Sequence, residues 1–138
     1  MILVTGGAFQ GKTDFVKERF SLSDSDFADG ESCPFHQIGY KPVLNRLHLL
    51  VKRMLEAGYS EEEMEASILQ GLRSGGCRMV LTDEIGCGIV PMKKEERLWR
   101  EWAGRLSCRL AKEADTVVLI QCGLPTVLKG ELPGGKTL

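Results

Sequence analysis

The chain lacks a long apolar run, an excess of charge of either sign and a basic N-terminal leader. A membrane-spanning helix needs about 20 consecutive apolar residues. The sequence therefore argues against membrane insertion and secretion, and we expect a soluble cytoplasmic protein. Lys and Arg number 18 against 19 Asp and Glu, which gives a formal net charge of -1. Because no general field attracts nucleic acid or an anionic membrane, a small-molecule substrate is easier to accommodate than a polyanion.

The cysteines are odd in number and include no Cys-x-x-Cys pair; they are Cys33, Cys77, Cys87, Cys108 and Cys122. This pattern argues against a disulfide framework and against a thiolate zinc site, so we expect buried, reduced thiols. The chain has 138 residues, of which 43% are hydrophobic, and can furnish one core. We expect a single domain over residues 1–130 and a flexible C-terminal tail over residues 131–138.

Short apolar runs alternate with segments of helical periodicity. The runs predict strands over 1–5, 26–29, 78–82 and 116–121, and the periodic segments predict helices over 12–20, 42–56, 60–72 and 94–114. Such alternation is typical of parallel β-α units whose right-handed connections place helices on both faces of the sheet. Ligands of these folds bind beyond the carboxyl ends of the strands.

A glycine-rich loop follows the first predicted strand. Its sequence fits the pattern G-x-x-x-x-G-K-[ST] with Gly6, Gly7, Ala8, Phe9, Gln10, Gly11, Lys12 and Thr13. Glycines let successive backbone N–H groups turn toward phosphate oxygens, and the following helix directs its positive end at the anion. We expect Lys12 to contact the β and γ phosphates of ATP or GTP, and Thr13 to ligate Mg²⁺. The alternative is a glycine-rich turn without a ligand.

This motif predicts the fold class more closely. We expect an α/β, three-layer P-loop NTPase (RecA-like) domain with a mainly parallel central sheet and helices on both faces. The domain over residues 1–130 would then be a single P-loop nucleotide-binding domain. The loop lies between a predicted strand and a predicted helix, which is the context that the motif requires.

Two carboxylates follow the predicted strand 78–82. Asp83 and Glu84 suit a P-loop enzyme, because Mg²⁺ must also be held from a second strand. One of them could bind the metal, directly or through water, while the other orients or deprotonates the attacking hydroxyl. The alternative is a pair of solvated acids. Asp29, at the end of the predicted strand 26–29, is a weaker candidate for nucleotide binding.

Other polar residues favour structural roles. His48 lies beside the apolar stripe of the predicted helix 42–56, where a satisfied interior or boundary histidine is expected rather than a catalyst. His36 lies in a loop and has no companion at ligand spacing. The arginines of the predicted helix 94–114 are expected to form a solvated basic face, although Arg100 or Arg105 could reach a phosphate.

Three segments of the chain are distinctive when taken together: GGAFQGKT, DEIGCGIVP and REWAGRLSCRLAKEADTVVLIQCGLPTVLKG. They resemble the adenosylcobinamide kinase / adenosylcobinamide-phosphate guanylyltransferase (CobU-type) family. The resemblance covers residues 1–20 and 78–129 and extends to the helix at 45–55. It implies an enzyme that phosphorylates the aminopropanol hydroxyl of adenosylcobinamide with ATP or GTP, and it allows a homo-oligomer. Asp29 corresponds loosely to an acidic residue that contacts nucleotide in the family.

The sequence also departs from the family pattern. The segment that carries the guanylylated histidine in long members is largely missing, and neither His36 nor His48 lies in a matching context. Asp83 stands where long members more often have Asn, and Ser107-Cys108 replaces an Asn-Gln pair. We therefore expect an NTP-dependent kinase in cobalamin biosynthesis. The alternatives are a bifunctional kinase and guanylyltransferase, or a nucleotide-binding regulatory protein without turnover.

Overall fold

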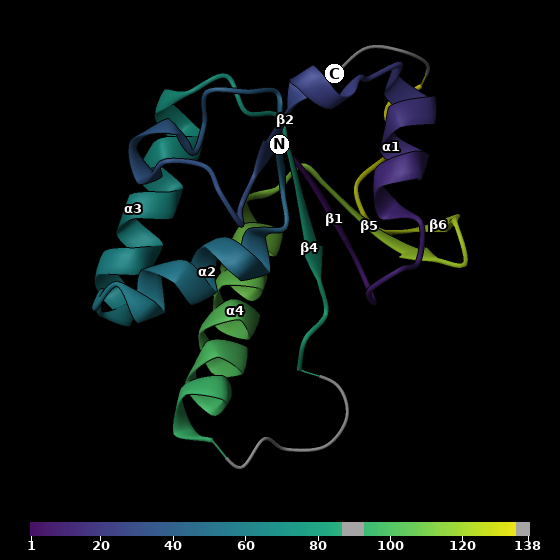
Figure 1. Ribbon diagram of the computed structural model, residues 1–138. Coiled ribbons are helices and arrows are strands. Elements are labelled where there is room, and N and C mark those ends of the chain that lie inside the picture. Colours follow the sequence, from purple (N-terminus) through teal and green to yellow (C-terminus); the bar gives the residue numbers. More distant parts are fainter. Residues whose placement is uncertain (87–92, 135–138) are drawn as a thin grey trace.

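Strands and helices alternate along most of the chain (Figure 1). The computed structural model describes residues 1–86 and 93–134. The strands are Ile2–Gly6 (β1), Phe27–Asp29 (β2), Val43–Asn45 (β3), Met79–Asp83 (β4), Thr116–Gln121 (β5) and Leu124–Lys129 (β6). The helices are Lys12–Phe20 (α1), Leu47–Glu56 (α2), Glu61–Ser74 (α3) and Lys94–Glu113 (α4), with 3-10 turns at Asp24–Asp26 and Phe35–Gln37.

The strands form one sheet in the order β2-β3-β4-β1-β5-β6. Neighbouring strands are parallel except β6, which pairs antiparallel with β5. In the register of β1 and β4, Gly6 lies opposite Asp83. The glycine-rich loop and the acidic end of β4 therefore leave the sheet side by side, at its carboxyl edge.

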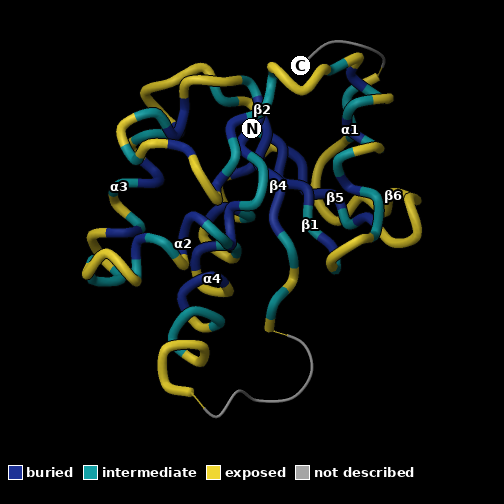
Figure 2. Tube along the Cα trace, viewed as in Figure 1, coloured by how far each residue is buried: buried dark blue, intermediate teal, exposed yellow. Residues whose placement is uncertain are grey.

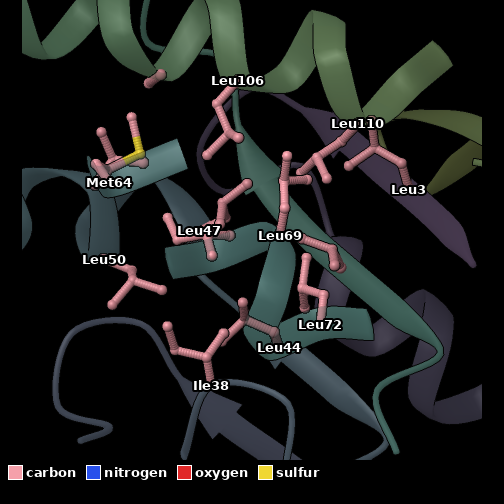
Figure 3. Close-up of a cluster of buried hydrophobic side chains, with 14 of the residues drawn as sticks. Leu3, Ile38, Leu44, Leu47, Leu50, Met64, Leu69, Leu72, Leu106 and Leu110 are labelled. Carbon is pink, nitrogen blue, oxygen red and sulfur yellow. The ribbon is translucent and has the colours of Figure 1, made fainter. Parts of the chain in front are cut away.

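Helices cover both faces of the sheet, as the sequence predicts. In Figure 1, α1 lies on one side of the sheet and α2, α3 and α4 lie on the other. Alternate residues of β1 divide between two cores, because Leu3 packs with α2, α3 and α4 whereas Val4 packs with α1. Figure 3 shows Leu3 in the larger core, together with leucines of α2, α3 and α4. The mainly parallel, three-layer α/β fold expected from the sequence is confirmed.

The predicted helix over 42–56 is wrong at its start. Val43 and Leu44 belong to β3, and the helix begins only at Leu47. Arg46 separates the two elements in a left-handed conformation, with φ 54° and ψ 50°. Val43 contributes to the core beside α1 and Leu44 to the opposite core. In the sequence, a strand that is buried on both faces appears as a continuous apolar run. Here that run directly precedes the apolar stripe of α2, so the two could not be told apart by periodicity.

The edge strand β6 has no counterpart among the strands predicted from the sequence. All six residues of this edge strand are exposed (Figure 2), so the alternation of buried and exposed positions that marks a strand is missing. Pro125 is compatible with an edge strand because it has no N–H to donate to a further neighbour. After β6, Glu131 accepts a hydrogen bond from the Thr116 hydroxyl at 2.7 Å. The flexible tail over residues 131–138 stays a prediction, because residues 135–138 lie outside the described part.

Cys33, Cys77, Cys108 and Cys122 are free thiols. The expectation of buried thiols is wrong for Cys108 and Cys122, which are exposed on α4 and in the turn after β5. Within residues 1–86 and 93–134, no helix has the length and apolarity needed to cross a membrane. The cytoplasmic location stays a prediction.

Candidate functional site

The glycine-rich loop joins the end of β1 to the start of α1. A Cβ added to Gly6 would lie 2.4 Å from the carbonyl oxygen of Ile120 in β5, so only glycine allows this close approach of the two strands. At the other end of the loop, Gly11 has φ 86° and precedes the first residue of α1. Lys12 and Thr13 therefore lie in the first turn of the helix, where unpaired N–H groups and the helix dipole favour an anion.

The turn after β5 holds the tip of the loop. The backbone N–H of Gly123 donates to the Gln10 carbonyl oxygen at 2.8 Å, and the N–H of Cys122 donates to Gln10 Oε1 at 2.8 Å. Cys122 has φ 52°, an unusual value for a residue other than glycine. These bonds fix Gln10 from both its backbone and its side chain, and they make the β5–β6 connection part of the wall around the loop.

Lys12 is buried, with 7% of its surface exposed. Its ammonium group donates to the carbonyl oxygens of Gly7 at 2.7 Å and Gly6 at 3.2 Å. It also lies 2.6 Å from Asp83 Oδ1, at the end of β4. A buried cation needs such partners because desolvation would otherwise favour its neutral form. The loop and β4 thus share one cation at the carboxyl edge of the sheet.

His48 of α2 contacts Asp83 from the opposite side. The backbone N–H of Asp83 donates to His48 Nδ1 at 3.2 Å, so the proton of the neutral ring resides on Nε2. His48 Nε2 lies 3.4 Å from Asp83 Oδ2. Burial lowers the pKa of His48, and the negative charge of Asp83 opposes that shift only in part. A neutral His48 therefore fixes the backbone of Asp83 and faces its carboxylate.

A second helix supports this histidine. The indole nitrogen of Trp99 in α4 donates to the carbonyl oxygen of His48 at 2.6 Å. The two rings lie 6.5 Å apart, centroid to centroid. Three elements therefore meet at Asp83, because α1 supplies Lys12, α2 supplies His48 and α4 anchors the histidine. His48 is the satisfied interior histidine that the sequence predicts, but its contact with Asp83 was not expected.

Arg46, between β3 and α2, forms a separate charged group with Asp29 and Glu31. Its Nε donates to Asp29 Oδ1 at 3.0 Å, a second bond reaches Asp29 Oδ2, and its terminal nitrogen lies 2.7 Å from Glu31. Burial raises the pKa of the Asp29 carboxyl, but hydrogen bonds from Arg46 and from the Glu31 N–H outweigh it and hold that pKa below its usual range. This group ties the ends of β2 and β3 together.

A cavity of about 430 Å³ lies above the carboxyl edge of the sheet. It is lined by Phe9, Gln10, Gly11, Lys12, Thr13, Asp14, Asn45, Arg46 and Asp83. We call it the loop cavity. Most of the glycine-rich loop forms one wall, and the ends of β3 and β4 form the other. The arrangement offers a buried cation and a helix N-terminus beside a carboxylate, which suits an anion bound with a metal cation.

The structure brings most of the predicted site residues together. Phe9 to Thr13 and Asp83 line the loop cavity, whereas Gly6 and Gly7 contribute carbonyl oxygens to Lys12. Glu84 and Asp29 are not among its lining residues. Asp29 contacts Arg46, which lines the cavity, but does not line the cavity itself. Nucleotide binding by Asp29 stays a prediction. Ala8 belongs to the loop but is also not a lining residue.

Asn45 and Arg46 line the loop cavity but were not among the site residues predicted from the sequence. Both were assigned to a helix interior, although they mark the carboxyl end of a parallel strand, where ligands bind. Recognition of β3 would have identified them. Arg105 and Arg109 of α4 do not line the loop cavity. Instead they pair with acidic residues of α3, Arg105 with Glu61 at 2.6 Å and Arg109 with Glu65 at 2.7 Å.

The remaining candidates do not join the site. His36 is exposed in a 3-10 turn and contacts Gln37. In the part of the chain that the structure describes, no three His, Cys, Asp or Glu residues are grouped to hold a metal ion by themselves. Most of the segment DEIGCGIVP, from Cys87 onward, lies outside the described residues.

Comparison with known proteins identifies relatives of the chain. The family described as cobinamide kinase / cobinamide phosphate guanyltransferase matches residues 39–128. This range contains β3, β4 and α4, whereas the glycine-rich loop precedes it. A curated relative, the bifunctional adenosylcobalamin biosynthesis protein CobU of Salmonella typhimurium, is 35% identical over 69 residues. The aligned region covers 50% of this chain and 38% of that relative.

Proposed function

The chain belongs to the cobinamide kinase / cobinamide phosphate guanyltransferase family, and from this premise we propose that it is an NTP-dependent small-molecule kinase. The proposed reaction transfers the γ-phosphate of ATP or GTP to a hydroxyl of adenosylcobinamide or a related molecule in cobalamin biosynthesis. The observation that carries the proposal is the 2.6 Å contact between Lys12 of the glycine-rich loop and Asp83 of β4. It brings a phosphate-binding cation and an acidic group to one point.

Lys12 and the loop bind the phosphates in this proposal. Two loop carbonyl oxygens hold the Lys12 ammonium toward the cavity, and the first turn of α1 provides N–H groups for the anion. Phosphoryl transfer depends on positioning and on stabilisation of charge, because the transferred group carries its charge on three oxygens. A desolvated cation interacts more strongly with that charge than an exposed one.

The residues of the loop cavity fit Mg²⁺. The cation prefers oxygen ligands and is commonly held by one or two carboxylates together with phosphate oxygens. The Thr13 hydroxyl and the Asp83 carboxylate, both in the lining of the loop cavity, supply such oxygens. We propose these two residues as the magnesium site. When bound, Mg²⁺ would neutralise developing negative charge on the phosphates.

Glu84 has a different position and a different proposed role. It lines a second cavity beside α4 rather than the loop cavity, and its backbone N–H donates to the Gly6 carbonyl oxygen at 3.0 Å. We propose that the Glu84 carboxylate is the general base that accepts the proton of the acceptor hydroxyl. The hydroxyl oxygen bonds to the γ-phosphorus, the bond from that phosphorus to the bridging oxygen breaks, and the nucleoside diphosphate leaves with the electron pair. The proton passes to Glu84.

Guanylyl transfer through a histidine has less support in this chain. His48 Nδ1 accepts a backbone hydrogen bond, Nε2 faces Asp83, and the residue is 5% exposed. His36 is exposed and is not among the residues lining the loop cavity. We therefore propose kinase activity alone for this chain. The description as bifunctional applies to the relative from Salmonella typhimurium. The homo-oligomer stays a prediction.

A test of the proposal follows nucleoside diphosphate production with Mg²⁺, ATP or GTP, and adenosylcobinamide. We expect production that depends on the corrinoid and falls by at least about 10³-fold in Lys12→Ala, since both binding and charge stabilisation are lost. Lys17→Ala is the matched control, because this lysine of α1 pairs with Asp24 at the surface. Tight nucleotide binding without turnover for any acceptor would instead indicate a regulatory protein.

A further inference from the structure

Phe9, at the tip of the glycine-rich loop, carries a large apolar side chain that the fold leaves uncovered. The residue is fully exposed, and its backbone is left-handed, with φ 59°. A bulky residue in this conformation is an outlier, and such outliers gather where a site demands them. Phe9 also lines the loop cavity. Its phenyl ring has no hydrogen-bonding group, so binding of phosphate or metal gives the side chain no role.

The loop tip is fixed beside the turn between β5 and β6. Gln10, the neighbour of Phe9, accepts hydrogen bonds from the backbone N–H groups of Cys122 and Gly123 in that turn. The exposed ring can therefore adjust about its own side-chain torsions, but its backbone stays at the turn. Leu124, which follows Gly123, is 69% exposed. These bonds thus join two segments that each present an uncovered apolar side chain to solvent.

The strand order gives the direction of a nucleotide across this site. Strand β1 lies between β4 and β5, with β6 at the edge beyond β5. Lys12 contacts Asp83 at the end of β4, and Asp83 also lines the second cavity, where Glu84 lies. In the proposed function, the reacting γ-phosphate belongs on that side of the loop. The α-phosphate and the nucleoside then extend the other way, toward the β5–β6 turn and Phe9.

We infer that the ring of Phe9 is the surface on which the purine base of the nucleotide stacks, with the β5–β6 turn beside it. The inference rests on the proposed function. Exposed aromatic side chains bind nucleobases by stacking, and such stacking tolerates different bases because every base has a π face. A purine offers a larger face than a pyrimidine. Phe9 therefore favours purine nucleotides without choosing between adenine and guanine.

The test compares nucleotides with a probe that has no base. Phe9→Ala should lower the affinity for ATP and for GTP at least about 5-fold, since one stacked base loses its aromatic partner. The affinity for tripolyphosphate should be retained. Phe9→Tyr keeps the ring and should bind nucleotides like wild type, whereas Phe9→Leu, apolar but not planar, should not. Tyr40→Ala is the matched control, because Tyr40 is an exposed aromatic residue outside the cavity lining.

Calorimetric titration of each variant with ATP, GTP, UTP and tripolyphosphate provides the comparison. Wild type should bind ATP and GTP with similar affinity and UTP more weakly, and Phe9→Ala should remove this preference for purines. Equal losses of affinity for ATP and tripolyphosphate would overturn the inference, because the ring would then act through the shape of the loop. Unchanged affinity for ATP in Phe9→Ala would also overturn it, and would indicate that the exposed ring contacts a protein partner instead.

A structural measurement separates this inference from the proposed function. In wild type, nuclear Overhauser effects should connect the ring protons of Phe9 with the H8 proton of bound ATP, and Phe9→Leu should lack them. Such contacts in a protein that phosphorylates no corrinoid would contradict the kinase assignment alone. Phosphorylation of a corrinoid by a protein whose bound ATP shows no contact with Phe9 would contradict the stacking assignment alone.

Discussion

Asp83 lies between two basic side chains, with Oδ1 2.6 Å from Lys12 Nζ and Oδ2 3.4 Å from His48 Nε2. In the proposed function, the carboxylate and the phosphates of a nucleotide would compete for the Lys12 ammonium group. The same carboxylate is the proposed ligand of Mg²⁺, which would draw it away from Lys12. Nucleotide and metal are therefore expected to bind cooperatively, because each removes an obstacle to the other.

Asp83→Asn should uncouple the two ligands. In EDTA, the affinity for ATP or GTP should rise several-fold, because the competing charge beside Lys12 is gone. With Mg²⁺, the affinity gain from the metal should shrink and kcat should fall by about 10²-fold. Calorimetric titration with and without Mg²⁺ measures the first effect. Asp24→Asn, which removes an exposed carboxylate paired with Lys17, provides the control. An unchanged effect of Mg²⁺ would contradict the metal assignment of Asp83.

Stability should depend on pH through His48. Its pKa is lowered in the folded state from the ordinary value of 6.5. As pH falls through 6.5, the unfolded chain gains a proton that folded His48 does not accept, so the free energy of unfolding decreases until the folded-state pKa is reached. Each unit by which the fold lowers this pKa corresponds to about 1.4 kcal/mol of stability lost at low pH. Above about pH 7, His48 is neutral in both the folded and the unfolded chain, so its titration no longer changes the free energy of unfolding.

Urea denaturation of His48→Gln between about pH 5 and pH 7.5 checks this effect, since glutamine does not titrate. The variant should lose the part of the pH dependence that wild type shows below 6.5. His36→Gln is the matched control, because His36 is exposed. Equal pH dependence in wild type and His48→Gln would show that His48 is not held neutral by the fold.

Arg46 should influence the phosphates through charge. Its guanidinium pairs with Asp29 and Glu31 and lines the loop cavity. Arg46→Gln leaves two carboxylates without that cation beside the cavity, so we expect nucleotide affinity to fall about 10-fold, with a smaller loss at high salt. Arg105→Gln removes an arginine paired with Glu61 on α3 and should leave affinity unchanged. The nucleotide affinity of each variant would be measured at 50 mM and at 500 mM salt. If the ratio of these two affinities is the same in Arg46→Gln and Arg105→Gln, Arg46 has no electrostatic role.

Two glycines should respond in opposite directions to alanine. Gly6→Ala forces a methyl group to within 2.4 Å of the Ile120 carbonyl oxygen, so β1 and β5 must separate. We expect destabilisation of about 1–3 kcal/mol. Gly104→Ala adds a methyl group in open space on α4 and should stabilise by about 0.5–1 kcal/mol. Thermal denaturation of both variants measures the difference, and a neutral Gly6→Ala would contradict the close approach of the two strands.

The sequence predicted the parts of the site that are encoded locally. The loop from Gly6 to Thr13 has a fixed spacing with a physical reason for each position, and its flanking strand and helix follow from periodicity. Asp83 and Glu84 were found because they directly follow an apolar strand. Their separate positions, one between the two cavities and one on the α4 side, were left open, since adjacent residues at a strand end give no signal of direction.

Contacts between distant elements could not be read from the sequence. The three-residue strand β3 is too short, and too apolar on both faces, to be distinguished from the start of α2. Asn45 and Arg46 were therefore hidden within a predicted helix. The pairing of His48 with Asp83 depends on how α2 packs against β4, and the exposed edge strand β6 has no buried face to create a pattern.

Transfer of the γ-phosphate itself is the most direct test of the proposed function. Wild-type protein would be incubated with Mg²⁺, adenosylcobinamide and ATP or GTP labelled at the γ-phosphorus, and the corrinoid would then be separated from nucleotides and counted. We predict label on the corrinoid with wild type and with Lys17→Ala, and none with Lys12→Ala. Label that remains in the nucleotide, or that appears only as inorganic phosphate, would contradict the assignment of this site to a kinase.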